Sequence, residues 1–378
     1  MISGVNRAAK AAIARKRITS NVRRLVAATK KTLESKISEA GRERISAPLV
    51  GDTVNAMVET GELIRFSHSA RGESFSLPDA DPVALELRRT QLQTLLGVYH
   101  AHSSGVAGQP GNLGREGVLG KAAEDMLGRA FANSTTTERF FWGDTSRFRD
   151  VTLTQPSDGL IAIRDPVQGY KVADHLALVE VKNRRDWPYP ENYMPWKLVR
   201  NAYKFDMVGV YFSRRIPRIT FWAAFKAIGA VAVETFNQFA PPDVETTLAG
   251  VRHKDGLGYH DLYFSEVVPP YLQRQVDKLP ERILSARDRM KAVGHIVEPY
   301  LDRLADKKCI APERPRLMKT LRSELEQFDK DNEADETAAT DEEAGDKSAE
   351  ALDGYGDDEM EARLELEREL RADLRPQE

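Results

Sequence analysis

The sequence predicts a mixed α/β protein with a basic helical front, a central α/β region and a helix-rich acidic end. Three observations predict this class. Apolar residues recur at helical spacing over residues 20–37, short apolar runs of strand length cluster between residues 139 and 225, and helical patterning returns over residues 271–328. Hydrophobic residues make up 41% of the 378 residues, which is enough for a folded core in two or three domains.

The front of the chain predicts helices followed by a hairpin. After the first periodic stretch, a short helix is expected to start at Ser46-Ala47-Pro48 and to stop near Gly61. Two strand-like runs, 63–66 and 74–77, follow on either side of a turn. This order resembles a winged helix-turn-helix domain, with LVGDTVNAMVETGELIRF as its recognition helix running into the wing. We assign residues 1–80 to this domain.

The rest of the chain predicts a connecting segment, a central domain and a C-terminal region. A helix after Asp81-Pro82 and the glycine-rich stretch 103–114 make residues 81–113 a connection. In the domain 114–268, a helix (114–131) precedes strands at 139–142, 159–164 and 172–183, a helix at 191–204, strands at 207–213 and 218–225, and a hairpin near 257–265. Residues 269–329 predict a helical extension, and residues 330–378 an acidic tail with too few apolar residues to pack.

Charge is distributed unevenly along the chain. The net charge is −3, yet residues 331–378 hold 19 acidic and 5 basic residues, so the first 330 residues carry +11. Residues 1–44 alone hold 12 basic and 3 acidic residues. A basic body of this kind is typical of proteins that bind polyanions. The acidic tail is expected to bind a basic partner or the protein's own basic body, or to serve solubility alone.

Several classes of protein are excluded or disfavoured. The single cysteine, Cys309, can form neither an internal disulfide nor a cysteine-based zinc site, which favours a reducing, cytoplasmic setting. The sequence has no apolar run long enough for a membrane span and no phosphate-binding loop of an ATP motor. We therefore expect no membrane partner.

The most informative segment is QPSDGLIAIRDPVQGYKVADHLALVEVKNRRDW. It places Glu180, Val181 and Lys182 at the end of an apolar strand and Asp158 at the start of an earlier one. The connecting loop contains Asp-Pro and Gly, which favours an antiparallel pair. If the two strands pair so that the residue numbers of each cross-strand pair add up to 338, Asp158 faces Glu180. The Cβ atoms of such a pair are roughly 4.5–5.5 Å apart. A slip of one residue would put the two acids on opposite faces of the sheet.

Two carboxylates at such a short distance repel one another unless a cation lies between them. With the carbonyl of Val181 they form a set of hard oxygen ligands suited to Mg²⁺ or Mn²⁺. Lys182 can orient a water molecule or offset developing charge. The competing interpretation is a structural ion pair at the edge of a sheet.

The pattern resembles the PD-(D/E)xK nuclease superfamily, which includes many restriction endonucleases and archaeal-type Holliday junction resolvases. Its restriction endonuclease-like αβββαβ core matches the order of elements from Gly114 to Ser213. The resemblance implies that Asp158, Glu180 and Lys182 take the metal-binding and catalytic positions. A glutamate on the preceding helix often completes such sites, and NLGREGVLGKAAEDML offers Glu116 first and Glu124 second. The sequence departs from the pattern at Pro156, which lies two residues before Asp158 instead of directly before it.

Basic residues near this motif and at the front are candidates for binding nucleic acid. They fall in three groups: Lys197, Arg200 and Lys204 on one face of the helix after the motif; Arg184 and Arg185 directly after it; and Arg15, Lys16, Arg17, Arg23 and Arg24 at the front. Tyr193, Trp196 and Tyr203 are expected either to stack on unpaired bases or to lie in the core.

Together these features predict a Mg²⁺- or Mn²⁺-dependent endonuclease that hydrolyses phosphodiester bonds, with double-stranded DNA as the expected partner. The resemblance implies a role in restriction, defence or mobile-element biology. A cut in both strands needs two active sites, which favours a homodimer or a subunit of a larger complex. Two alternatives stay open: an RNA or structure-selective nuclease, and a non-catalytic winged-helix DNA-binding regulator with a nuclease-like domain.

Overall fold

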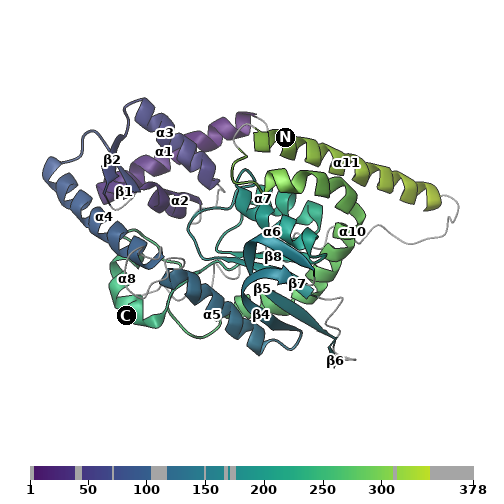
Figure 1. Cartoon of the computed structure of the whole chain (residues 1–378). Helices are drawn as coiled ribbons and strands as arrows, with labels where there is room; N and C mark the ends of the chain where they lie inside the picture. The colour runs from purple at the N-terminus through teal and green to yellow at the C-terminus, as the bar shows by residue number, and fades with distance from the viewer. Residues whose placement is uncertain are drawn as a thin grey trace.

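The computed structural model describes residues 4–38, 45–69, 72–103, 117–148, 150–165, 169–170, 176–309 and 313–340. Over these residues the chain is a mixed α/β protein with a helical C-terminal region (Figure 1). None of the helices in these ranges is long and apolar enough to cross a lipid bilayer. The predicted glycine-rich linker lies mostly outside the described residues.

The front of the chain combines helices with a small antiparallel sheet. Its elements are α1 (Gly4–Leu25), β1 (Ala27–Thr29), α2 (Lys30–Ser38), α3 (Ala47–Glu59), β2 (Ile64–His68) and β3 (Gly72–Ser76), with strand order β1-β3-β2. The predicted hairpin is confirmed, and Arg65 pairs with Phe75. The predicted continuous helix over residues 20–37 is wrong, because Val26 has a φ of 65° and β1 follows it. The buried Ala27 and Ala28 favour the strand because they pair with β3 at this point.

Helix α4 (Pro82–Ser103) begins where the sequence predicts and joins the front to a distant part of the chain. It packs on α8 (Glu245–Arg252), and Leu92 and Tyr99 share a buried cluster with Leu248 and Tyr259. The guanidinium of Arg88 donates to the carbonyl of Ala27 at 3.1 Å and to that of Gly256 at 2.9 Å. These contacts fix the front of the chain against the central region.

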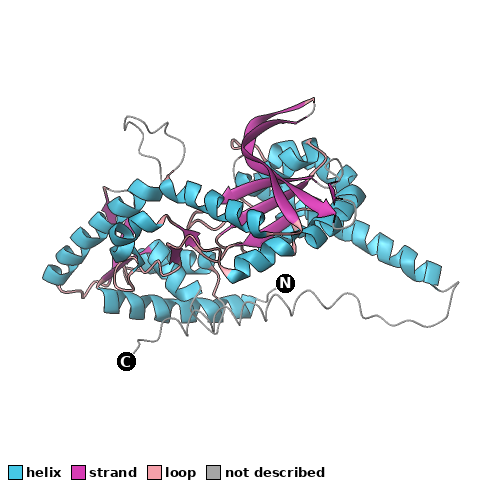
Figure 2. Ribbon diagram, turned by 90° about the horizontal axis from the view of Figure 1, so that it is seen from below, coloured by secondary structure: helices cyan, strands magenta, loops and turns pink. Residues whose placement is uncertain are grey.

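The central region is built on a mixed sheet with strand order β4-β5-β7-β8-β9, and β6 pairs with β5. The first three strands of this order are antiparallel, and β7, β8 and β9 are parallel. The strands are β4 (Thr137–Phe148), β5 (Val151–Asp165), β6 (Gly169–Tyr170), β7 (Leu176–Lys182), β8 (Val208–Ser213) and β9 (Val231–Glu234). Figure 2 shows a long two-stranded ribbon that projects beyond the helices, as expected of β4 and β5, the longest strands.

Helices cover both faces of this sheet. One face packs on α5 (Val118–Asn133) and α9 (Pro270–Asp277), where Val179 and Val181 contact the same cluster as Leu127 and Leu272. The opposite face packs on α6 (Tyr193–Lys204) and α10 (Leu279–Leu304), and α11 (Glu313–Thr340) packs on α10. The predicted helix-rich C-terminal region is thus confirmed, and α11 continues past Asp329 to Thr340. Residues 341–378 of the predicted acidic tail lie outside the described residues.

Two predicted strand segments are wrong. Residues 218–224 form the helix α7 (Arg218–Ala224), and the next strand of the sheet is β9. The run is rich in aromatic and β-branched residues, which misled the interpretation, while Pro217 fits the start of a helix. Residues 257–265 form no hairpin, because β11 (Leu262–Tyr263) pairs in parallel with β10 (Gln238–Phe239).

Candidate functional site

The candidate site lies where β5 and β7 separate. Their ladder pairs Ala162 with Leu176 and continues to Gly159 with Val179, so the predicted register is confirmed. The ladder ends at that pair. Beyond it, the Asp158 carboxylate accepts a hydrogen bond from the backbone N–H of Val181 at 2.6 Å. A side chain thus replaces the next rung of the ladder and holds Asp158 beside the end of β7.

Three oxygen groups converge on one ammonium at this point. The Nζ atom of Lys182 lies 2.7 Å from Oε1 of Glu180 and 3.4 Å from Oδ2 of Asp158. It also donates to the carbonyl of Val181 at 3.1 Å. These three oxygens are the proposed metal ligands, and they surround a cationic group. The arrangement satisfies the requirement that close carboxylates share a positive charge.

A second lysine reaches the same carboxylate from α6. The Nζ atom of Lys197 lies 3.1 Å from Oε1 and 3.4 Å from Oε2 of Glu180. The helix is positioned at its start by Asn192, whose side chain caps the N–H of Met194 at 3.1 Å. The sequence predicted that Lys197 contacts a phosphate, whereas the structure places its ammonium group against the carboxylate of Glu180.

Two further residues of the site were not predicted. Tyr211 on β8 is the register partner of Glu180 and is buried, and burial raises the pKa of its phenol above the usual value. Asn201 on α6 donates to the carbonyl of Gln155 at 2.9 Å and to the hydroxyl of Ser157 at 3.2 Å, which fixes α6 to β5 next to Asp158. Asn201 lies four residues after Lys197, and this helical spacing is the signal that could have found it.

Burial and charge act in opposite directions at this site. Glu180 is only 1% exposed, and burial alone would raise its pKa, but the Lys182 and Lys197 ammonium groups outweigh burial and hold the pKa below its usual value. Burial, with the neighbouring Glu180 carboxylate, raises the pKa of Asp158 to about 6. Burial would lower the pKa of Lys182, but Glu180 and Asp158 outweigh it and raise that pKa. The cluster therefore keeps one acid firmly ionised and leaves the other close to titration.

The third acidic ligand is not identified by the structure. Glu116 lies outside the described residues. Glu124 is half-buried on α5, which packs on the sheet face of Val179 and Val181 and not on the face of Glu180. Within the described ranges, no group of three or more His, Cys, Asp or Glu side chains is placed to hold a metal ion.

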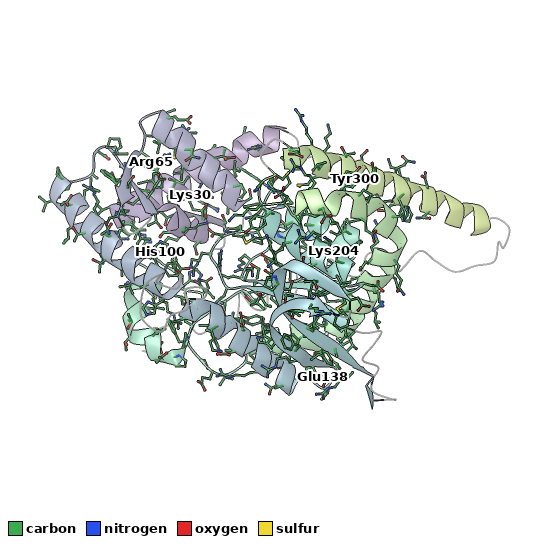
Figure 3. The ribbon with its side chains drawn as sticks, in the orientation of Figure 1. Lys30, Arg65, His100, Glu138, Lys204 and Tyr300 are labelled. Carbon is green, nitrogen blue, oxygen red and sulfur yellow. The ribbon has the colours of Figure 1, made fainter. Side chains whose placement is uncertain are left out.

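The basic residues predicted to bind nucleic acid fall into different environments. The role predicted for Arg185 is wrong. This residue is buried, forms an ion pair with Asp261 and lies over the ring of Tyr259, so it cannot reach a phosphate. Arg184 next to it is exposed. On α6, Lys204 pairs with Asp302 of α10 at 3.1 Å, and Arg200 donates to the side chain of Asn201. Figure 3 labels Lys204 in the region where Figure 1 labels α6 and α10.

The five basic residues of the front all lie on α1. Several are paired with acids: Arg15 with Glu62 at 2.9 Å and Arg24 with Asp255 at 3.0 Å, while Arg23 is 3.9 Å from Asp79. Four of them line one shallow hollow: Arg15, Lys16, Arg23 and Arg24. Arg17 is half-buried beside them in sequence. The pairs are exposed, so each is weak and can open to a polyanion.

Trp196 and Tyr203 of α6 belong to the interior rather than to a binding surface, while Tyr193 at the start of the helix is half-buried and its role stays a prediction. Trp196 is buried, and its Nε1 atom donates to the carbonyl of Pro190 at 2.7 Å. The hydroxyl of Tyr203 donates to the carbonyl of Ile228 at 2.7 Å. For these two residues the core interpretation is confirmed.

Comparison of the chain with protein-family models, with curated proteins and with solved structures finds no match.

Proposed function

We propose that the protein is a metal-dependent nuclease, a hydrolase that cleaves phosphodiester bonds in nucleic acid, with DNA as the first substrate to test. The observation that supports this most strongly is the convergence of Asp158, Glu180 and the Val181 carbonyl on a single cation. Removing two acids and two lysines from water at the end of a strand costs free energy of folding. A function for these residues explains why the chain keeps them there.

The oxygen donors fit the proposed Mg²⁺ or Mn²⁺. Asp158, Glu180 and the Val181 carbonyl would hold the ion, and they already surround the Lys182 ammonium. A bound ion of this kind supplies Lewis acidity and lowers the pKa of a bound water. Glu116 remains the proposed additional ligand, and Glu124 is disfavoured because α5 covers the other face of the sheet.

The protein's own residues would contribute charge and position. Lys197 and Lys182 keep Glu180 ionised, so it is ready to bind a cation at neutral pH. Lys182 would orient the attacking water and offset negative charge on the phosphate. The water oxygen bonds to phosphorus, the bond from phosphorus to the 3′ oxygen breaks, and the 3′ oxygen takes up a proton. By resemblance, the products are 5′-phosphate and 3′-hydroxyl ends.

The order of elements supports the finer fold assignment. The succession α5, β4, β5, β7, α6 and β8 agrees with the αβββαβ core of PD-(D/E)xK nucleases. The succession α1, β1, α2, α3, β2 and β3 agrees with a winged helix-turn-helix domain. Helix α3 carries Asp52 and Glu59, so the basic face of α1 is the better candidate for phosphate contact. A role in restriction or defence rests on the resemblance alone.

The decisive experiment is cleavage of supercoiled plasmid, linear duplex, single-stranded, branched and RNA substrates in Mg²⁺ or Mn²⁺. We expect Glu180→Gln and Lys182→Ala to lower cleavage by at least about a hundredfold while nucleic-acid binding stays largely intact. The control is Lys319→Ala, which changes an exposed lysine of α11 that is not among the candidate binding residues. Cleavage by Glu180→Gln at the parental rate would sink the assignment. Nucleic acid that is bound but left intact by the unmodified protein would favour the non-catalytic regulator.

A further inference from the structure

Strand β4 presents two exposed aromatic side chains next to the acidic site. Phe140 and Phe141 are 47% and 49% exposed, which is unusual for neighbouring phenylalanines on a strand. Strand β4 is at the edge of the sheet, beside β5, which carries Asp158. Figure 3 labels Glu138, near the start of this strand, at the margin of the molecule.

The register puts Phe141 on the same face of the sheet as the acids. Phe141 pairs with Leu160, which lies two residues after Asp158 and shares its buried cluster with Leu178 of β7. Side chains two apart on a strand share a face, and cross-strand partners do as well. Phe141, Asp158 and Glu180 therefore project from one face, on neighbouring strands.

The ring of Phe141 also lies toward the part of β4 that is across from Asp158. Trp142 pairs with Gly159 and Thr145 with Ser157, so Gly143 lies in the bulge across from Asp158. A Cβ atom added at Gly143 would lie 3.8 Å from Cζ of Phe141. This is an ordinary van der Waals distance, so the ring lies beside Gly143, whose φ of 135° is a conformation that favours glycine.

An unpaired nucleobase suits this surface better than a second copy of the chain does. Pairing of two edge strands needs a regular row of N–H and C=O groups, and β4 has register shifts between Arg139 and Phe141, between Trp142 and Thr145, and between Thr145 and Arg147. Bulges of this kind protect edges from pairing. An aromatic ring can stack on any base, and the exposed Arg147 lies on the same strand for phosphate contact.

We propose that Phe141 forms a stacking platform for unpaired bases adjacent to the scissile phosphate, with the exposed Phe140 beside it at the first register shift of β4. Resting on the proposed nuclease function, this makes the substrate single-stranded or partly unpaired nucleic acid, such as a flap or fork. Continuous duplex, whose bases are stacked on one another, gains nothing from the platform.

The test separates stacking from simple apolar contact. Phe141→Trp keeps an aromatic ring and Phe141→Leu keeps an apolar side chain without one, and a Phe140→Ala, Phe141→Ala double variant removes the platform. The control is Leu87→Ala, which is 74% exposed on α4, away from the site. Binding is measured in Ca²⁺ with a forked oligonucleotide that carries 2-aminopurine in its unpaired arm, and with the matched full duplex.

We expect Phe141→Leu to weaken binding of the fork by about five- to a hundredfold, with smaller 2-aminopurine quenching, while Phe141→Trp and Leu87→Ala bind as the parent does. Binding of the duplex should not change. Equal losses on fork and duplex, or no loss with the double variant, would overturn the platform. So would a dimer in sedimentation that the double variant dissociates, because the patch would then be a protein interface. Because the experiment measures binding and not cleavage, its result does not depend on whether the protein is a nuclease. Failure of the stacking proposal is therefore distinguishable from failure of the proposed nuclease function.

Discussion

The carboxylate of Asp158 accepts the backbone N–H of Val181 at 2.6 Å, at the point where the ladder between β5 and β7 ends. The same oxygen, Oδ2, lies 3.4 Å from Nζ of Lys182. Asp158 thus has two tasks: it joins the separating strands, and it supplies one of the charges around the lysine. Substitutions that treat these tasks differently can tell them apart.

Asp158→Ala should destabilise the fold more than Asp158→Asn. Alanine leaves the Val181 N–H without its acceptor, which costs about 1–3 kcal/mol, whereas asparagine keeps an oxygen there. Both variants should lose cleavage, because neither carries the charge. Urea unfolding at neutral pH measures the difference, and equal stability of the two variants would show that the hydrogen bond contributes little.

The raised pKa of Asp158 predicts how stability depends on pH. Burial raises this pKa from 3.8 to about 6, so the folded protein binds the proton more tightly than the unfolded chain does. The resulting stabilisation is fully present below about pH 4 and is lost as the pH rises through 6. Relative to Asp158→Asn, the parent should therefore lose stability between pH 4 and 7. A flat difference across that range in urea titrations would contradict the assigned shift.

Lys197→Gln should lower the Mg²⁺ concentration needed for half-maximal cleavage by several-fold. The Lys197 ammonium contacts Glu180 and competes with a cation for its oxygens. Lys204→Gln, on the same helix but paired with Asp302, serves as the control and should behave as the parent does. Titration of Mn²⁺ by calorimetry checks the affinity without relying on turnover. A raised metal requirement in Lys197→Gln would instead show that Lys197 supports the bound state.

The central site could be predicted from the sequence because its signal is local. The alternation along β7 fixes which of its side chains share a face, and the loop between the two strands favours an antiparallel pair. The register that brings Asp158 beside Glu180 was assumed, the structure confirms it, and the roles of these residues rest on the resemblance. Lys197 was found, but with the wrong contact, because the sequence does not say how α6 lies on the sheet. Arg185 was misassigned for a related reason: its partner, Asp261, lies far away in the sequence and only the fold brings it near.

Asp261→Asn should destabilise the protein by about 3–5 kcal/mol, because it leaves the buried Arg185 and Arg214 without their counter-charge. Burial alone would raise the pKa of Asp261, but the two guanidinium groups outweigh it and hold the pKa below its usual value. The contribution is therefore present above about pH 4 and is lost as the pH falls below that. Asp255→Asn, which opens the exposed pair with Arg24, should cost at most about 1 kcal/mol. Urea unfolding at several pH values compares the two, and similar losses would contradict the assigned role of burial.

Removal of residues 341–378 should strengthen nucleic-acid binding at low ionic strength. The segment holds 15 acidic and 5 basic residues and can compete with a polyanion for the basic face of α1. The cut belongs after Thr340 and not at Asp329, because Asp329 pairs with Arg289 and Phe328 packs against the core. Binding measured across a salt series should show the largest gain at low salt, since screening weakens the competition. A matched variant with the acids of the segment changed to Asn and Gln tests charge apart from length. Equal binding by the full chain and both variants at low salt would mean that the acidic segment does not restrain the basic face.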